Sequence, residues 1–191
     1  MKAAILVDEQ NAMSTMHLMD VKGLTRWKTF FDAIHHVVKR DYPTLQMDYC
    51  MYGAVVPKKV NHSLHEKRRR FFHSLSKDQI KVSLGYCLLN AQGVMTEKGV
   101  DVELALDIYQ KALEGYELLI VFSGDSDLVP AIERAKALGT KVVAVLGDNQ
   151  PATHMSKVCD ATIPFTAIVH LLPKSSIVFF KETHLKGAVL T

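Results

Sequence analysis

The feature that most constrains the fold of this chain is an apolar run, Leu118 to Phe122, which ends abruptly in Ser123-Gly124-Asp125-Ser126-Asp127. Five apolar residues bounded by turn-forming residues are typical of a strand buried inside a sheet. Asp125 and Asp127 would then follow the carboxyl end of a central strand. Ligands bind at this edge in open parallel α/β sheets, and two carboxylates there favour a hard divalent cation such as Mg²⁺ or Mn²⁺.

The same motif has a purely structural alternative. Aspartate and serine are common N-caps, so Ser126 or Asp127 could simply cap a helix that extends from Leu128 to Leu138. Taken alone, the motif leaves both interpretations open.

Two other segments place aspartates in comparable positions. The apolar run 3–7 ends in Asp8, which Asn11 follows closely, and Asp101 opens a segment of helix formers, where the helix dipole favours negative charge. These two aspartates and the pair after residue 122 could therefore converge on one point. Because clustered carboxylates repel one another, convergence would imply a bound cation.

Strands and helices alternate along the chain. Apolar runs predict strands at 2–7, 46–52, 80–84, 118–122, 141–146 and 161–165, and helical patterns occupy 25–39, 60–75, the segment from 101, 128–138 and a short stretch near 152, with a loop at 90–98. This alternation predicts one mainly parallel sheet with helices on both faces, which is a three-layer α/β fold.

Composition limits the class of protein. The chain has 191 residues, of which 48% are hydrophobic and 23% charged, as is typical of one globular domain. No apolar run approaches the roughly 20 residues that span a bilayer. Asp8 and Glu9 interrupt the apolar start, which argues against a signal peptide. We therefore expect a cytoplasmic protein without membrane association.

Positive charge is concentrated between Pro57 and Lys77, where seven basic residues outnumber one acidic residue, whereas the whole chain has a net charge of only +3. The segment also has the apolar periodicity of a helix. A basic helix suits contacts with the phosphates of a nucleic acid, although a solvated charged face is an equally good interpretation. The residues predicted to contact nucleic acid without reading its sequence are Lys58, Lys59, Arg68, Arg69 and Arg70.

Four segments together resemble the NYN domain of the PIN-like nuclease superfamily, most closely its LabA-like branch. They are 98–107, which includes Lys98-Gly99-Val100-Asp101, then 119–130, 139–145 and 156–161. The resemblance covers residues 1–165 and implies a Rossmann-like fold with an acidic pocket. Residues 166–191 would form a C-terminal extension, in which the apolar run Ile177 to Phe180 either packs on the domain or makes a homodimer contact.

The resemblance also implies an activity, the hydrolysis of RNA phosphodiester bonds by a ribonuclease that uses Mg²⁺ or Mn²⁺ and leaves 5′-phosphate and 3′-hydroxyl ends. RNA that is single-stranded or structured is expected rather than duplex DNA. Asn11 would be a neighbouring polar ligand or substrate contact. The implied catalytic and metal-binding carboxylates are Asp8, Asp101, Asp125 and Asp127. Asp107 matches the family pattern too, but it lies about 240° around a helix from Asp101, which predicts a different role.

One departure from the family pattern concerns the first strand. Where the family typically has Asp-Gly-x-Asn, this chain has Asp8-Glu9-Gln10-Asn11, and Glu9 adds a charge and lacks the conformational freedom of glycine. The pocket could be reshaped or its activity reduced. A non-catalytic RNA-binding or regulatory module is therefore an alternative. A phosphatase that uses Asp125-Ser126-Asp127 as its nucleophile motif is another, although such motifs usually follow the first strand.

Overall fold

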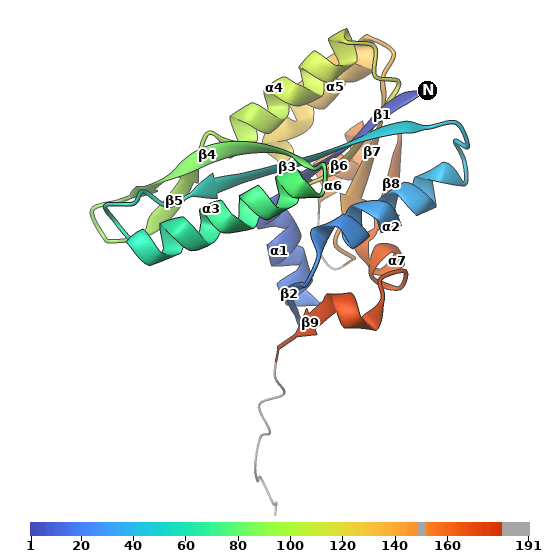
Figure 1. Cartoon of the computed structure of the whole chain (residues 1–191). Coiled ribbons are helices and arrows are strands. Elements are labelled where there is room, and N and C mark those ends of the chain that lie inside the picture. The colour runs from blue at the N-terminus through green and yellow to red at the C-terminus, as the bar shows by residue number, and fades with distance from the viewer. Residues whose placement is uncertain (149–151, 181–191) are drawn as a thin grey trace, which may run out of the picture.

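The computed structural model describes residues 1–148 and 152–180 (Figure 1). The main sheet has seven strands in the order β5-β4-β3-β1-β6-β7-β8, and β5 is antiparallel to β4 while the other neighbouring pairs are parallel. The strands are β1 (Lys2–Asp8), β3 (Gln46–Val55), β4 (Lys81–Leu89), β5 (Met95–Lys98), β6 (Leu118–Phe122), β7 (Lys141–Leu146) and β8 (Ala161–Pro164). This arrangement confirms the predicted three-layer α/β fold.

Helices cover both faces of the sheet (Figure 1). One face packs against α1 (Glu9–Leu18), α2 (Trp27–Lys39), α3 (His62–Lys77) and α7 (Phe165–Val169), and the other against α4 (Val100–Leu113), α5 (Val129–Ala137) and α6 (Thr153–Val158). Within the described residues, no helix is both long and apolar enough to cross a membrane.

The central strand β1 determines where the functional edge lies. Its side chains alternate between the two cores, with Ile5 in one and Leu6 in the other, and both are fully buried. In register, Ile5 lies between Tyr49 of β3 and Ile120 of β6. Because β1 and β6 are parallel neighbours, the residues that follow them meet at the carboxyl edge of the sheet.

Three elements near the carboxyl edge differ from the sequence-based expectation. Residues 9–18 form α1 directly after β1, although no helix was expected before residue 25. Residues 95–98, expected within a loop, form β5, and β4 continues to Leu89 beyond the expected end at residue 84. The carboxyl edge is therefore enclosed by a helix and a hairpin that the apolar pattern did not predict.

A second, two-stranded antiparallel sheet joins β2 (Val21–Leu24) to β9 (Ile177–Phe179). The Phe180 ring packs edge-on against the ring of His17 on α1, with ring centroids 5.2 Å apart. The first residue of the predicted extension, Thr166, lies within α7. The apolar run that begins at Ile177 thus contacts the same chain, residues 181–191 lie outside the described residues, and a homodimer contact stays a prediction.

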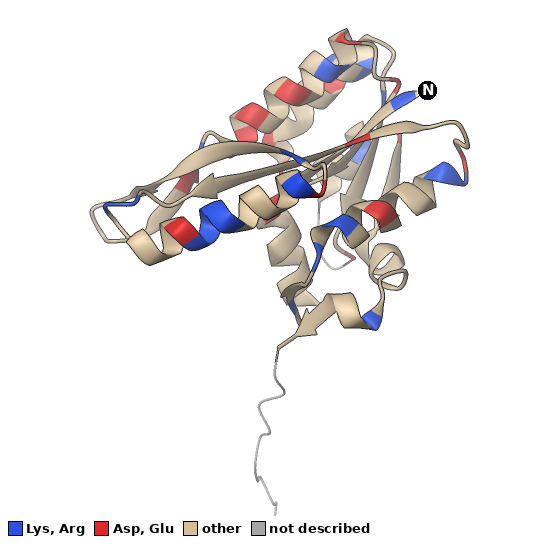
Figure 2. Cartoon of the chain, in the orientation of Figure 1, with Lys and Arg blue, Asp and Glu red and all other residues tan. Residues whose placement is uncertain are grey.

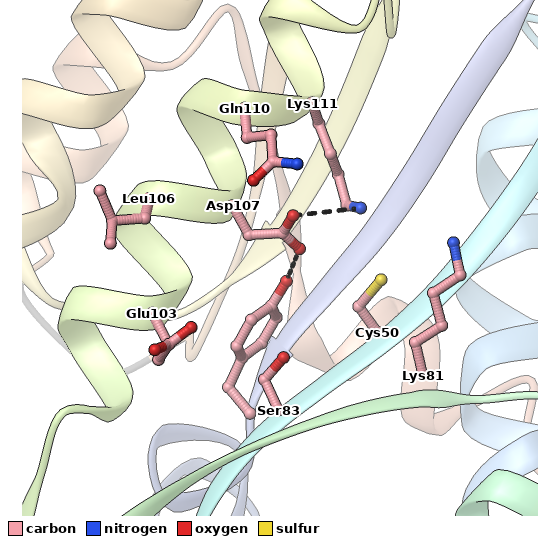
Figure 3. A pocket seen from close by; sticks show the side chains of 9 residues that line it. Cys50, Lys81, Ser83, Glu103, Leu106, Asp107, Gln110 and Lys111 are labelled. Carbon is pink, nitrogen blue, oxygen red and sulfur yellow. Dashed lines mark hydrogen bonds and ion pairs between the residues drawn. The ribbon is translucent and has the colours of Figure 1, made fainter.

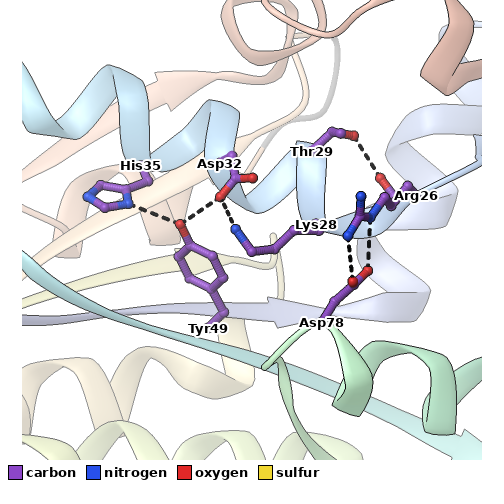
Figure 4. A network of polar contacts seen from close by, with 7 residues as sticks. All are labelled: Arg26, Lys28, Thr29, Asp32, His35, Tyr49 and Asp78. Carbon is purple, nitrogen blue, oxygen red and sulfur yellow. Dashed lines mark hydrogen bonds and ion pairs between the residues drawn. The ribbon is translucent and has the colours of Figure 1, made fainter.

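Matched charges fix α2 over the sheet (Figure 4). Arg26 donates two hydrogen bonds to Asp78, from Nε at 3.2 Å and from an Nη at 2.7 Å. The Tyr49 hydroxyl on β3 donates to Asp32 at 3.0 Å and lies 3.0 Å from Nδ1 of His35. These contacts tie the start and the middle of α2 to its neighbours.

Candidate functional site

Asp8 is the last residue of β1, and it is almost fully buried at the carboxyl edge of the sheet. It caps α1, because its Oδ1 accepts a hydrogen bond from the backbone N–H of Asn11 at 3.0 Å. Its Oδ2 accepts a second bond from Asn11 Nδ2 at 2.9 Å. The carboxylate that the sequence predicts as catalytic therefore also begins a helix.

Asp8 and Asn11 together hold the loop after β6. The buried Ser123 hydroxyl donates to Asp8 Oδ2 at 3.4 Å and accepts from the Asp125 N–H at 3.2 Å. Asn11 Oδ1 accepts from the Gly124 N–H at 3.1 Å. The position of Asp125 is thus fixed from β1 through this chain of hydrogen bonds.

Asp125 has the capping role that the sequence suggested for Ser126 or Asp127. Its Oδ1 accepts a hydrogen bond from the Asp127 N–H at 2.9 Å, at the start of a 3₁₀ turn, η1 (Ser126–Leu128). Helix α5 follows that turn without a side-chain cap of its own. The cap occupies one oxygen of Asp125, and Asp127 is exposed to solvent.

Asp101 lies in the first turn of α4, as the sequence predicts. Gly99, two residues before Asp101, has a φ of +82°, a backbone conformation that favours glycine. The connection from β5 to α4 passes so close to β4 that a Cβ atom on Gly85 would lie 2.4 Å from the Lys98 carbonyl oxygen. A glycine at position 85 therefore lets this connection reach the site.

Electrostatics links the four predicted carboxylates. Partial burial and then the charges of Asp125 and Asp127 raise the pKa of Asp101. Burial is also the main cause that raises the pKa of Asp8, against its hydrogen bonds with Asn11, and the charge of Asp101 adds to the increase. The structure thus brings Asp8, Asp101, Asp125 and Asp127 to one edge, where their charges repel.

A fifth carboxylate, Glu97, comes from β5 and was missed by the sequence analysis. Its Oε2 is buried without a hydrogen-bond partner. Burial and the charge of Glu9 raise the pKa of Glu97, two of the site aspartates contribute less, and Arg68 lowers it. The signal that could have revealed it is Gly93 in the short stretch 90–94 that follows an apolar run, which is typical of a longer hairpin loop.

Glu9, which replaces the family glycine, forms an ion pair with Arg68 of α3. Two guanidinium nitrogens of Arg68 donate to the two carboxylate oxygens of Glu9, each at 2.8 Å, and Nε donates to the Ala54 carbonyl at 3.1 Å. The side chains are only 10% and 21% exposed, for Glu9 and Arg68 respectively. The charge that Glu9 adds is therefore matched, and the same contact engages one of the residues predicted to bind RNA.

The other four predicted nucleic-acid contacts are exposed. They lie in the loop before α3 and on the helix itself, where Figure 2 shows a run of basic residues, and they are Lys58, Lys59, Arg69 and Arg70. Among the described residues, neither Arg69 nor Arg70 forms an ion pair like the one between Arg68 and Glu9.

Asp107 does not join the acidic edge. It accepts a hydrogen bond from the Tyr52 hydroxyl and pairs with Lys111 Nζ at 3.3 Å, in a pocket of about 350 Å³ between α4, β3 and β4 (Figure 3). Lys111 is almost fully buried. Asp107 thus neutralises a buried cation, which agrees with the different role that its position on the helix predicts.

The oxygen donors at the acidic edge suit a divalent cation without forming a closed metal site. Among the described residues, no three histidine, cysteine, aspartate or glutamate side chains lie close enough together to coordinate one ion. Mg²⁺ commonly binds through one or two carboxylates and keeps several water ligands. Asp8 is engaged by Asn11 and Ser123, so Asp101, Asp125 and Asp127 are the more available donors for a hydrated ion.

Comparisons with known proteins agree with this fold. A protein of unknown function from Vibrio parahaemolyticus has a similar crystal structure, with a TM-score of 0.64 and 19% sequence identity over 93% of this chain and 96% of that chain. No curated protein matches the chain. A model of the NYN domain matches residues 2–170, which is most of the sequence. The protein therefore belongs to the NYN domain family, which has a PIN-like, nuclease-type fold.

Proposed function

We propose that this protein is a metal-dependent ribonuclease that hydrolyses RNA phosphodiester bonds at the acidic edge. One observation carries the proposal: the end of β1, the first turn of α4 and the loop after β6 bring Asp8, Asp101, Asp125 and Asp127 to one edge of the sheet, where burial and neighbouring charges raise the pKa values of Asp8 and Asp101. Such repulsion at a ligand-binding edge is relieved by a divalent cation, and perturbed carboxylates commonly mark functional sites.

The proposed division of roles follows the contacts. One or two of the carboxylates of Asp101, Asp125 and Asp127 would hold a hydrated Mg²⁺ or Mn²⁺ ion, which would lower the pKa of a bound water and neutralise charge on the scissile phosphate. Asp8 and Asn11 position the Asp125 loop through Ser123 and Gly124. The products would be 5′-phosphate and 3′-hydroxyl ends.

The substrate and the branch of the family are part of the same proposal. The exposed Lys58, Lys59, Arg69 and Arg70 would attract the RNA backbone, whereas Arg68 would act indirectly by holding Glu9. Placement in the LabA-like branch is supported by the segment from Lys98 to Asp107 and by the motif from Ser123 to Asp127.

Cleavage of a labelled single-stranded RNA tests the proposal when it is followed with Mn²⁺, with Mg²⁺ and with EDTA. We expect metal-dependent cleavage that falls at least about a hundredfold in Asp125→Asn, because loss of even an indirect contact to a metal costs about 10- to 100-fold. The fold should persist, since an asparagine Oδ1 can accept the Asp127 N–H bond that Asp125 accepts. Asp41→Asn, which removes an exposed charge ahead of β3 at the opposite edge, is the matched control.

Two results would contradict the proposal. Cleavage that continues in EDTA would exclude the metal, and full activity in Asp125→Asn would exclude the site. A loss of activity in Asp41→Asn as large as in Asp125→Asn would show that overall charge, rather than the acidic edge, controls cleavage.

A second function, RNA binding without catalysis, is favoured by the geometry of Asp8. Both of its oxygens are already hydrogen-bonded, and within the described part of the chain no three side chains could enclose a metal. A regulatory module of this kind would bind RNA in a salt-dependent manner, equally well in EDTA and in Asp125→Asn, with no turnover under any metal condition.

A further inference from the structure

Tyr86 of β4 lies at the rim of the acidic edge. Its side chain is 55% exposed, which is unusual for an aromatic ring within a strand. A Cβ atom on Gly99 would lie 4.0 Å from the ring carbon Cε1, so the ring lies against the residue that begins α4. Asp101 is in the first turn of the same helix. An exposed aromatic ring therefore lies against the start of the helix that carries a site carboxylate.

The same face of the hairpin carries more apolar surface and a cation. Leu84 and Leu88, which alternate with Tyr86 along β4, are 47% and 49% exposed. Directly opposite Tyr86 on β5 is the exposed Lys98, its cross-strand partner. A contiguous exposed strip of this kind indicates an interaction surface.

Charge favours RNA over a protein as the occupant of this strip. Lys98 lies beside the aromatic ring, and α3, which packs against β4, carries exposed basic residues such as Arg69. Single-stranded nucleic acids bind to surfaces that combine stacking aromatic rings with cations that contact the backbone. A protein partner would more commonly meet an apolar core that is depleted of lysine.

We propose that Tyr86 and Lys98 form a binding subsite for single-stranded RNA beside the acidic edge, where a base stacks on the Tyr86 ring and Lys98 contacts an adjacent phosphate. The inference rests on the proposed function in taking RNA as the substrate. It adds a site that would distinguish single-stranded from duplex RNA, because the bases of a duplex stack on one another and do not present a free face to the ring.

Equilibrium binding measured by fluorescence anisotropy in EDTA tests the subsite independently of cleavage. The probes are a labelled single-stranded RNA and a duplex of the same sequence. We expect Tyr86→Ala to weaken single-strand binding about tenfold, and to change duplex binding less than about twofold, since stacking on one aromatic ring contributes about that much. Tyr86→Phe should bind like the wild type because it keeps the ring. Lys98→Ala should weaken the binding of both probes, and the salt dependence of binding should fall by an amount that corresponds to about one phosphate contact.

Tyr42→Ala is the matched control, because Tyr42 is a partly exposed tyrosine beside a lysine, Lys141, and it lies ahead of β3 at the opposite edge of the sheet. Wild-type affinity of Tyr86→Ala for the single strand would overturn the subsite, and so would equal losses in Tyr86→Ala and Tyr42→Ala. A wild-type dimer that dissociates in Tyr86→Ala, with unchanged RNA affinity, would assign the strip to a second copy of the chain instead.

The two proposals fail in distinguishable ways. If the wild type binds single-stranded RNA through Tyr86 but cleaves nothing with Mg²⁺ or Mn²⁺, the ribonuclease proposal fails and the subsite stands. If the wild type cleaves RNA with metal and Tyr86→Ala binds and cleaves equally well, the subsite fails and the ribonuclease proposal stands.

Discussion

Two carboxylates of one helix, Asp101 and Asp107 of α4, lie in opposite electrostatic settings. Asp101 faces Asp125 and Asp127, and their charges raise its pKa together with burial. Asp107 faces a buried ammonium, that of Lys111, and the hydroxyl of Tyr52 (Figure 3). Both positions match the family pattern, so the pattern alone does not separate them. What distinguishes them is charge balance. Asp107 is matched by the Lys111 ammonium and holds α4 against the sheet. Asp101 faces other carboxylates, so its charge is unmatched and it is available to a ligand.

The largest effect is expected on RNA cleavage when the unmatched carboxylate, Asp101, is substituted. Asp101→Asn should lower metal-dependent RNA cleavage at least about a hundredfold, because it removes a proposed metal donor. Its free energy of unfolding should stay within about 0.5 kcal/mol of the wild type, since relief of repulsion offsets the lost interaction with the helix dipole. Cleavage assays and urea denaturation in EDTA measure the two quantities. A large loss of stability would show that Asp101 is structural.

Substitution of the matched carboxylate, Asp107, should lower stability rather than cleavage. Asp107→Ala leaves the Lys111 ammonium buried without its carboxylate, which we expect to lower the free energy of unfolding by about 2–3 kcal/mol, less than for a completely buried pair because Asp107 is partly exposed. Urea denaturation measures this loss. The double variant Asp107→Leu with Lys111→Met should recover most of the stability. If Asp107→Ala instead abolishes cleavage in fully folded protein, the comparison fails.

A smaller effect concerns the ion pair between Glu9 and Arg68. Arg68→Met should lower the free energy of unfolding by about 1–2 kcal/mol, because Glu9 is left buried without a partner. The neighbouring Arg69→Met is the control and should change stability by less than about 0.5 kcal/mol, since Arg69 is exposed. Glu9→Gly in the Arg68→Met background should restore part of the loss. Additive effects of the two substitutions would show that the pair is not coupled.

The sequence predicts the parts of this molecule that depend on local pattern. The apolar runs at 2–7 and 118–122 correspond to β1 and β6, and the aspartates that follow them lie at one edge because parallel neighbours end together. Helix α1 was missed because its buried residues, such as Ala12 and Met16, do not form a continuous apolar stripe. Strand β5 was missed because it is short and half charged, and Glu97 was missed with it.

Other features of the site depend on tertiary contacts that no sequence pattern specifies. Glu9 forms an ion pair with Arg68, which lies 59 residues further along the sequence. The Arg68 guanidinium is therefore engaged by Glu9, whereas the helical pattern predicted that it lies with the other basic residues on the exposed face of the helix. Similarly, Asp125 rather than Ser126 became the cap, because Ser123 and Asn11 fix the backbone at that point. Residue type and strand order predicted where charges gather, whereas the pairing of each charge required the structure.

The smallest expected effect is a pH dependence of stability that comes from a second carboxylate matched by a cation, Asp48. Asp48 of β3 accepts hydrogen bonds from Lys81 at 3.0 Å and from the Tyr116 hydroxyl at 2.5 Å. Partial burial raises the pKa of Asp48, but these two bonds and the charges of Lys81 and Lys111 together lower it by more, so its pKa falls below the ordinary 3.8. The native state therefore keeps Asp48 ionised at a lower pH than the unfolded chain does. This stabilisation is fully present above the unfolded pKa and is lost as the pH falls through the folded pKa.

Accordingly, Asp48→Asn should lower the free energy of unfolding by about 1 kcal/mol at neutral pH, discounted for the partial exposure of Asp48. The difference from the wild type should shrink below about pH 4, where the wild-type carboxylate also becomes protonated. Urea denaturation from neutral to acidic pH measures it. Asp41→Asn is the control, because the exposed Asp41 carboxylate has no hydrogen bond or ion pair among the described contacts, and it should show a smaller difference. If Asp48→Asn were more stable than the wild type at neutral pH, carboxylates that face cations would not stabilise this fold, and the contrast between Asp101 and Asp107 would need another cause.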